Sequence, residues 1–481
     1  MNYQPVIGLE IHAQLKTRTK MFCRSANDPD EKRPNVNICP ICLGHPGTLP
    51  TINKKAVEHV LRLGLAIGGQ IADWTEFDRK NYFYPDLPKG YQISQYKLPL
   101  VTGGELLGTA ITRVHLEEDT ARSIHDDQNE NGGSLIDFNR AGVPLMELVT
   151  EPVIESAKQA GDFARELQLL LRYLDVSDAN MEKGEMRVEA NVSISRFDLK
   201  DPSPKVEPLG TDPRSTLGTK VEIKNLNSFR SVERAIEYEL KRQQKSLEAD
   251  EEVIQETRGW DEFREITFSQ REKESAHDYR YFPEPDLPPL RITDIPEWQN
   301  LAATIPELPW QRRTRYEREF GLKKSDIAII ISDQRYYLFF DEVVKYLSKT
   351  KLDLAGLTAN YLLSDLSSLS GSWPTADRFA ELIAMVGANE ISSRAAKDIL
   401  ATGLKTSPKT AVAEQGLLQQ SDETVLCDIV NQVISRNPKV VADYQNGKKT
   451  SLQFLVGQGM RLSRNSANPK ILARLLEEIL G

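Results

Sequence analysis

Alternating apolar and polar positions mark strands in the first half of the chain. In residues 6–15, every second side chain is apolar, and Glu10 and His12 share the opposite face. Residues 111–119, 145–151, 186–195 and 218–229 alternate in a similar way. Each of these strands therefore has an apolar face to bury and a charged face. We expect a mainly antiparallel sheet that helices cover on one side only.

Helical periodicity predicts three helices that cover this sheet, at residues 52–68, 155–174 and 228–248. A proline-rich strap at residues 279–290 ends the sheet domain, and strand patterning fades near residue 306. The later part has the spacing of short amphipathic helices at residues 333–347, 376–386, 391–401, 422–434, 450–464 and 468–480. The pattern as a whole predicts the α+β class, with an all-helical second part.

The composition is that of a soluble protein with several domains, since 40% of the 481 residues are hydrophobic and 27% are charged. No apolar run approaches the roughly 20 residues that cross a bilayer, and the N-terminus does not resemble a signal peptide, so we expect a cytoplasmic location without a membrane. The net charge of -9 argues against a protein that coats DNA or RNA with its whole surface. Residues 430–481, however, carry a local charge of +5.

Strand alternation divides the acids of residues 111–119 between two faces. Glu118 lies with Val114 and Leu116, whereas Glu117 lies with His115 on the other face. Oxygen ligands gathered in this way, together with those near Glu147, suit magnesium. From this stretch alone, the favoured interpretation is that these acids are solvated residues on an exposed face of the sheet, not ligands of a magnesium ion. A structural role and a metal or phosphate role for His12 are equally expected.

The chain has four cysteines, and three of them, Cys23, Cys39 and Cys42, are clustered near the N-terminus. A small number of clustered cysteines favours metal binding in a reducing compartment over a disulfide framework. Three thiols make an incomplete tetrahedron, for which Ser25 or His45 would supply the fourth ligand. A structural zinc ion is favoured, and an empty thiol cluster is the alternative.

Residues 78–95 combine basic and aromatic side chains. Arg79, Lys80 and Lys89 suit contacts with phosphate, and the tyrosines suit stacking on a base or lining a pocket. The alternative is a rigid surface loop held by Pro85 and Pro88. No Walker-A loop occurs in the sequence, which excludes a P-loop kinase.

Six motifs resemble the B-subunit family of the bacterial-type aspartyl/glutamyl-tRNA amidotransferases. They are VIGLEIHAQL, DRKNYFYPDLPKGYQISQ, HLEEDTAR, DFNRAGVPLMELVTEP, GTKVEIKNLNSF and YRYFPEPDLPPL. The resemblance covers essentially the whole chain and includes a tail of the YqeY-like type that contains FLVGQGMR. The related archaeal protein carries a large insertion for which this chain has no room.

The resemblance implies a cradle domain of the glutamine synthetase/guanidino kinase type at residues 1–292. A helical domain at residues 293–403 and a YqeY-like tRNA-binding tail at residues 404–481 would follow. It also implies that ATP phosphorylates the side-chain carboxylate of misacylated Glu-tRNA(Gln) or Asp-tRNA(Asn). Ammonia from a partner amidase, the A subunit, then forms the amide, and the small C subunit completes a heterotrimer. A non-catalytic tRNA-binding scaffold is the alternative function, and the sequence leaves open the choice between the glutamine and asparagine pathways.

The resemblance also implies roles for single residues. His12, Glu118 and Glu147 match the family's magnesium ligands, and Glu10, Glu117 and Lys80 would assist catalysis. Because alternation places Glu118 on the apolar side, we expect a bulge or the strand end to turn it inward. The residues expected to bind ATP phosphates are Arg79, Lys89, Arg140, Arg187 and Lys224, and those expected to bind tRNA are Lys448, Lys449, Arg461 and Arg464. Many zinc-bearing members have Cys-x-Cys where this chain has Ser25 in the second position.

Overall fold

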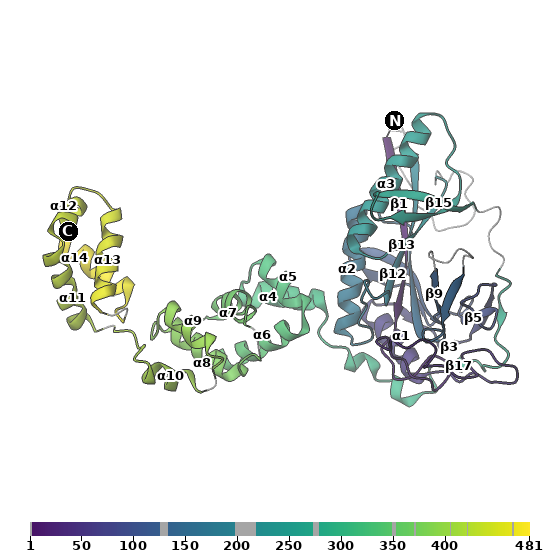
Figure 1. Cartoon of the computed structure of the whole chain (residues 1–481), viewed down its shortest axis with the longest axis horizontal. Helices are drawn as coiled ribbons and strands as arrows, with labels where there is room; N and C mark the ends of the chain where they lie inside the picture. Colours follow the sequence, from purple (N-terminus) through teal and green to yellow (C-terminus); the bar gives the residue numbers. More distant parts are fainter. Residues whose placement is uncertain are drawn as a thin grey trace. The chain divides into compact units, whose positions relative to one another are not determined.

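The computed structural model describes residues 2–125, 133–197, 218–272, 279–348, 353–369, 372–404, 406–420, 422–463 and 466–481. The chain divides into two compact units, of which the first ends at Leu308 and the second runs from Pro309 to Gly481 (Figure 1). No helix within the described ranges combines the length and the apolar character that crossing a membrane requires.

A large mixed sheet forms the centre of the first unit. Its strands are β1 (Asn2–Gln14), β2 (Gln70–Ile71), β6 (Val101–Thr102), β7 (Glu105–Leu106), β8 (Thr109–Glu118), β11 (Pro144–Thr150), β12 (Met186–Phe197), β13 (Val221–Leu226), β14 (Glu256–Asp261) and β15 (Ile266–Glu272). Their order is β15-β14-β13-β12-β1-β11-β8-β6-β2, and β7 pairs with β8. The pair β13–β14 is parallel, and the other strand pairs of this sheet are antiparallel. The predicted α+β class is confirmed as far as the large, mainly antiparallel sheet is concerned.

Helices cover the apolar face of the sheet, as the sequence pattern predicts. Ile7, Leu9, Ile11 and Ala13 of β1 are fully buried on this face. Helices α2 (Ala157–Tyr173) and α3 (Phe229–Glu248) pack against β1 and against β12 and β13, respectively (Figure 1). Helix α1 (Lys54–Ala66) packs against β8. Each helix begins where a side chain caps backbone N–H groups, from Asn53, Ser156 and Ser228, respectively.

The basic and aromatic segment at residues 78–95 forms a hairpin that lies against β8. Its strands are β4 (Asp78–Asn81) and β5 (Tyr91–Ser94), and β16 (Phe282–Pro283) from the proline-rich strap extends the sheet beside β4. The alternative of a surface loop holds only for residues 82–90, which include Pro85 and Pro88 and connect the two strands. Two further small sheets pair β9 (Arg122–His125) with β10 (Ser134–Asp137), and β3 (Trp74–Thr75) with β17 (Leu290–Arg291).

The second unit consists of helices in its described residues. After two short 3-10 turns in the first unit, η1 (Pro296–Trp298) and η2 (Leu301–Thr304), its elements are α4 (Pro309–Phe320), α5 (Lys324–Ser332), α6 (Gln334–Leu347), α7 (Ala355–Tyr361), η3 (Leu362–Leu366), α8 (Ala376–Gly387), α9 (Ser393–Ala401), α10 (Pro408–Glu414), α11 (Glu423–Arg436), α12 (Pro438–Gln445), α13 (Thr450–Leu462) and α14 (Pro469–Leu480). Helices α11, α13 and α14 enclose a core of their own that includes Leu426, Leu455 and Leu472. The six helices predicted for this part are confirmed, with ends that differ by a few residues.

Candidate active site

The register of the central strands brings four charged side chains into one row. His115 of β8 lies opposite Glu147 of β11, and Glu147 lies opposite His12 of β1. On its other side, His12 lies opposite Arg187 of β12. Directly opposed residues point to the same face of a sheet with their Cβ atoms about 5 Å apart. Strand pairing alone therefore assembles residues that are far apart in the sequence.

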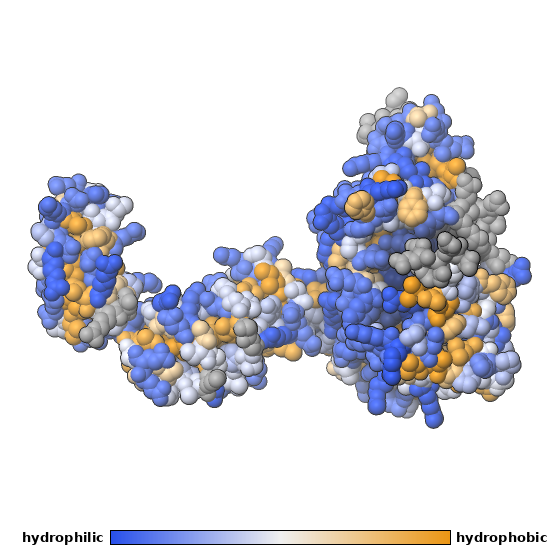
Figure 2. Space-filling model, in the orientation of Figure 1, coloured by the Kyte–Doolittle hydropathy of each residue, from blue (hydrophilic) through white to orange (hydrophobic). Residues whose placement is uncertain are grey.

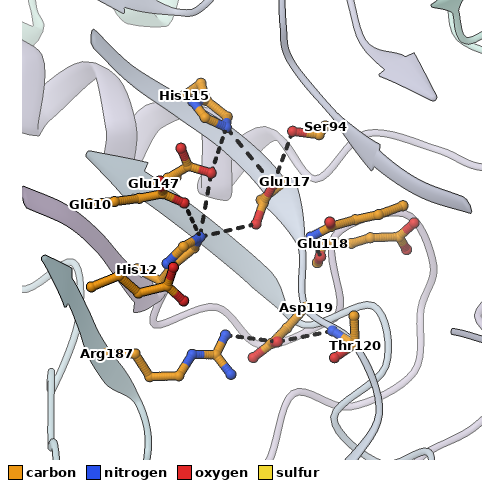
Figure 3. A network of polar contacts seen from close by, with 12 residues as sticks. Glu10, His12, Ser94, His115, Glu117, Glu118, Asp119, Thr120, Glu147 and Arg187 are labelled. Atoms are coloured by element: carbon orange, nitrogen blue, oxygen red, sulfur yellow. Dashed lines mark hydrogen bonds and ion pairs between the residues drawn. The ribbon is translucent and has the colours of Figure 1, made fainter. Parts of the chain in front are cut away.

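Five residues of this face form a compact group, here called the acid–histidine cluster: Glu10, His12, His115, Glu117 and Glu147 (Figure 3). The Nε2 atom of His12 lies 3.4 Å from Oε2 of Glu147, and 3.7 Å from Oε1 of both Glu10 and Glu117. The Nε2 atom of His115 lies 3.2 Å from Oε2 of Glu147 and 3.8 Å from Oε2 of Glu117. The donor atoms are thus spaced as ligands around a metal ion would be.

Two of the three acids of the cluster are buried, and Glu10 is partly exposed. Glu117 is 2% exposed and Glu147 is 4% exposed. The hairpin formed by β4 and β5 contributes Ser94, whose hydroxyl donates a 3.0 Å hydrogen bond to Glu117. The expectation of solvated acids on an open face is therefore wrong, because the hairpin lies against β8 beside these acids. Buried carboxylates require charged or hydrogen-bonding partners.

Electrostatic interactions within the cluster shift its ionisation. Burial alone would lower the pKa of His12, but contact with Glu147 and the charges of the acids raise it to about 9. The pKa of His115 rises to about 9 for the same reasons. Burial opposes ionisation of Glu147, yet the two histidines hold its pKa well below the usual range. Burial and the charge of Glu147 raise the pKa of Glu10 to about 7. The two histidines and the acids therefore stabilise one another's charged forms.

Glu118 does not join this cluster. Its side chain pairs with Lys89 and accepts a 2.9 Å hydrogen bond from the backbone N–H of Ile93. The bulge between β8 and β11 lies at Val149 and Thr150, near the other end of the strands. The expected inward turn of Glu118 is therefore absent, and Glu117 occupies the place beside His12 (Figure 3). The expected role of Glu118 as a magnesium ligand stays a prediction that this geometry does not favour.

The residues expected to bind ATP phosphates are each paired with a carboxylate. Arg79 makes a bidentate contact with Glu284, Lys89 contacts Glu118, Arg140 and Arg187 contact Asp119, and Lys224 contacts Glu189. Asp119 is itself buried and accepts a 2.8 Å hydrogen bond from Gln14. Arg187 lies opposite His12, and the charges of all five basic residues are already partly compensated in this structure.

Lys80 differs from these residues. Its ammonium group lies 5.1 Å from the ring centre of Tyr279, and within the described residues it has no carboxylate within 4 Å. Burial alone would lower its pKa, but Glu117 and Glu147 raise it. Lys80 thus supplies a positive charge that faces the acids without a direct ion pair.

The three clustered cysteines are close together, as the sequence predicts. One sulfur atom each from Cys23, Cys39 and Cys42 lies within 4.8 Å of the others. The Sγ atom of Cys42 is 3.9 Å from the hydroxyl of Ser25 and 3.7 Å from Nζ of the buried Lys20. The contact with Cys23 lowers the pKa of Cys42 to about 4. His45 is not part of this group in the described residues, so Ser25 is the better placed of the two expected fourth ligands.

Of the residues expected to bind tRNA, Lys448 and Lys449 lie in the turn between α12 and α13, and Arg461 lies on α13. Lys448, Lys449 and Arg461 are exposed, and Lys448 forms an ion pair of 3.3 Å with Asp443. Arg464 lies outside the described residues. Figure 2 shows hydrophobic and hydrophilic residues side by side on the surface of helices α11–α14.

Sequence reasoning missed His115 as a member of the site and gave Glu117 only an assisting role. The alternation of residues 111–119 did place both side chains on one face. The order in which the strands pair could not be read from the sequence. That order places β8 and β1 on either side of β11, which brings Glu117 within reach of His12.

Comparison with known proteins identifies relatives over the full length. A family model described as the GatB/GatE catalytic domain matches residues 5–297, and a model described as the GatB domain matches residues 337–480. The B subunit of the aspartyl/glutamyl-tRNA(Asn/Gln) amidotransferase of Caldicellulosiruptor saccharolyticus is 44% identical over 502 residues, which cover 100% of this chain and 99% of that protein. The proteins of the same name from Thermomicrobium roseum and Persephonella marina are 45% and 43% identical, with 100% of this chain and 99% and 100% of those proteins covered.

Proposed function

Because the chain belongs to the B-subunit family of the aspartyl/glutamyl-tRNA(Asn/Gln) amidotransferases, we propose that it is the ATP-dependent component of a glutamine-dependent tRNA amidotransferase. In this proposal, ATP phosphorylates the side-chain carboxylate of Glu-tRNA(Gln) or Asp-tRNA(Asn). Ammonia then displaces the phosphate and leaves the amide. The observation that supports this function best is the buried acid–histidine cluster, since a non-catalytic scaffold has no need for it.

The cluster fits a magnesium ion. Glu10, Glu117 and Glu147 offer hard oxygen atoms, and His12 offers a ring nitrogen within 3.7 Å of all three. When bound, magnesium neutralises the charge that spreads over the oxygens of a transferring phosphoryl group. We therefore assign the metal-binding role to His12, Glu117 and Glu147, with Glu10 at the edge of the site.

Lys80 is the best placed residue to hold a phosphate oxygen. It is directed toward the acids, has no carboxylate partner within 4 Å in the described residues, and lies against Tyr279. A lysine binds phosphate as a point charge, and close acids keep it protonated. Arg113, whose guanidinium lies 3.5 Å from Glu147, is a second cation at the same edge. Phosphate binding by Arg79, Lys89, Arg140, Arg187 and Lys224 would first require their present ion pairs to open.

The rest of the proposal follows from the family. The cradle of glutamine synthetase/guanidino kinase type would correspond to the large sheet and its covering helices. The partners would be an amidase, the A subunit, which releases ammonia from glutamine, and the small C subunit, in the cytoplasm. We also propose that the second unit divides near residue 403 and that the tail binds tRNA.

The test compares four glutamates in a complex with the partner proteins. Glu117→Gln and Glu147→Gln should each reduce ATP-dependent amidation of misacylated tRNA by at least ~100-fold, since each removes a buried metal ligand. Glutaminase activity of the partner should persist. Amide formation is measured on Glu-tRNA(Gln) and on Asp-tRNA(Asn), which also separates the two pathways.

The matched control is Glu151→Gln. Glu151 follows β11 and accepts a hydrogen bond of 2.7 Å from Thr112, outside the cluster. The Glu151→Gln variant should retain most of the amidation activity. Near-normal amidation by both Glu117→Gln and Glu147→Gln would contradict the proposed site, and loss in Glu118→Gln alone would return the metal role to Glu118.

The three thiols fit a structural metal site that is separate from the acid–histidine cluster. Cys23, Cys39 and Cys42 would hold zinc, with Ser25 or a solvent molecule completing four ligands. A structural zinc ion would stabilise the loop of residues 39–47 without taking part in the transfer.

A further inference from the structure

The acid–histidine cluster contains two overlapping sets of metal-binding donors. One set is Glu10, His12 and Glu147, and the other is His115, Glu117 and Glu147. In each set the donor atoms lie within 4.8 Å of one another. The proposed function needs one magnesium ion and assigns no ligand role to His115.

The two histidines approach the same carboxylates from different sides (Figure 3). Glu117 directs Oε1 toward His12 and Oε2 toward His115, at 3.7 and 3.8 Å. Oε2 of Glu147 lies 3.4 Å from His12 and 3.2 Å from His115. Glu117 thus faces the two imidazoles through its two oxygens and Glu147 through one shared oxygen, and both arrangements suit a carboxylate that bridges two ions.

The distances between the donor atoms also match those expected around metal ions that share ligands. Two adjacent ligands at about 2.1 Å from one ion are separated by roughly 3 Å. The observed contacts of His115, at 3.2 and 3.8 Å, therefore need only small movements to close on an ion. His115 is 2% exposed, its Nε2 atom makes the contacts with both carboxylates, and its Nδ1 atom has no hydrogen-bond partner among the described residues.

We propose that His115, Glu117 and Glu147 bind a second divalent cation beside the one at His12, with Glu117 and Glu147 shared between the two ions. This inference rests on the proposed function and extends it. Pairs of divalent ions about 4 Å apart are a recurrent way to stabilise both the attacking and the leaving oxygens in phosphoryl transfer. His115 would be the residue that distinguishes the second position from the first.

Manganese binding to the full-length chain tests the proposal without nucleotide. Equilibrium dialysis with Mn²⁺ should give two ions per chain at saturation, and electron paramagnetic resonance should show two exchange-coupled ions. His115→Gln should bind one ion with the spectrum of an isolated Mn²⁺. The control is His59→Gln, because His59 is equally buried and its Nε2 atom lies 2.9 Å from the carbonyl of Lys16, away from the cluster. This control should still bind two coupled ions.

One ion per wild-type chain at saturation, or an unchanged stoichiometry in His115→Gln, would overturn the second site. The wild-type spectrum answers the question even if the variant fails to fold, since coupling requires two neighbouring ions. Amidation is assayed on the same preparations in the complex. An active enzyme with a single ion would refute the second cation and leave the proposed function standing. Two coupled ions without any ATP-dependent amidation would refute the function instead.

Discussion

At the scale of single residues, Asp119 shows how the polar face of the sheet is held together. Its carboxylate is 3% exposed and accepts hydrogen bonds from Arg187 at 3.0 Å and Gln14 at 2.8 Å. Burial alone would raise its pKa, but Arg187 and Arg140 lower it to about 2. The same two arginines are expected phosphate ligands, so Asp119 also sets where their guanidinium groups lie.

The low pKa of Asp119 predicts a pH-dependent contribution to stability. Because the folded-state pKa lies below the ordinary value of 3.8, ionised Asp119 stabilises the fold above about pH 4, and this stabilisation is lost as the pH falls toward about 2. Asp119→Asn should lower the free energy of unfolding by roughly 2 kcal/mol at about pH 6 and by roughly half as much near pH 3. Urea unfolding at both pH values measures this, with Asp73→Asn at an exposed position as the control. An equal difference at both pH values would contradict the linkage.

Glu117 and Glu118 show which features of single residues the sequence predicts and which it does not. Alternation correctly placed them on opposite faces, because side chains of a strand alternate whatever its neighbours are. The resemblance selected Glu118 for the metal, but the structure puts Glu117 beside His12. How close the residues of the polar face come to one another, and how deeply they are buried, depends on strand order and on the hairpin that lies against β8, and both are tertiary features.

At the scale of elements, the sequence predicted the strands and helices of the site well and their pairing not at all. The helices at residues 155–174 and 228–248 became α2 and α3, because apolar periodicity and the serine caps agree. The hairpin of β4 and β5 was not predicted as strands, since its basic and aromatic residues lack a regular alternation. Its position follows from partners distant in sequence, such as Glu284 for Arg79 and Glu118 for Lys89.

The loop of residues 39–47 gives a prediction at this scale. It packs closely on the hairpin, since a Cβ atom on Gly44 would lie 2.5 Å from Cγ of Lys89. If the thiols hold zinc, Cys39→Ser should reduce bound zinc well below one per chain and lower the melting temperature by several degrees, because a structural metal contributes folding free energy. Metal analysis and thermal unfolding with and without a chelator measure both effects. Cys427→Ser, in α11, is the matched control and should keep its zinc. Wild-type protein with little zinc and a melting temperature that the chelator leaves unchanged would mean that the thiols bind no metal.

At the scale of the whole molecule, the charge distribution separates the helical tail from the rest. The chain carries -9 overall, whereas residues 430–481 carry +5. The sequence predicted this contrast and the helical character of the second unit, because both depend only on local composition and periodicity. Helices α11–α14 also share a hydrophobic core, so they can fold around their own apolar residues.

Removal of this tail gives the last prediction. A chain that ends at Leu417 keeps α10 and lacks the helices of the separate core, so its first unit should still fold and bind ATP. We expect weaker binding of tRNA and a flatter salt dependence, because each lost phosphate contact removes roughly 0.7 to 0.9 units from the log–log slope. Filter binding at several salt concentrations, in complexes with and without the tail, measures the slope.

Point variants locate the effect within the tail. Lys449 and Arg461 are exposed and form no ion pair with the described residues, so their alanine variants should reproduce much of the loss. Arg474→Ala should matter less, since Arg474 already pairs with Glu423. The contrast between these variants distinguishes the loss of a direct phosphate contact from the loss of overall positive charge. Each of the three changes removes one positive charge from the tail. If the truncated complex binds tRNA with the same affinity and the same salt slope, recognition must lie on the first unit or on a partner protein, and the basic tail is then only a solvated surface.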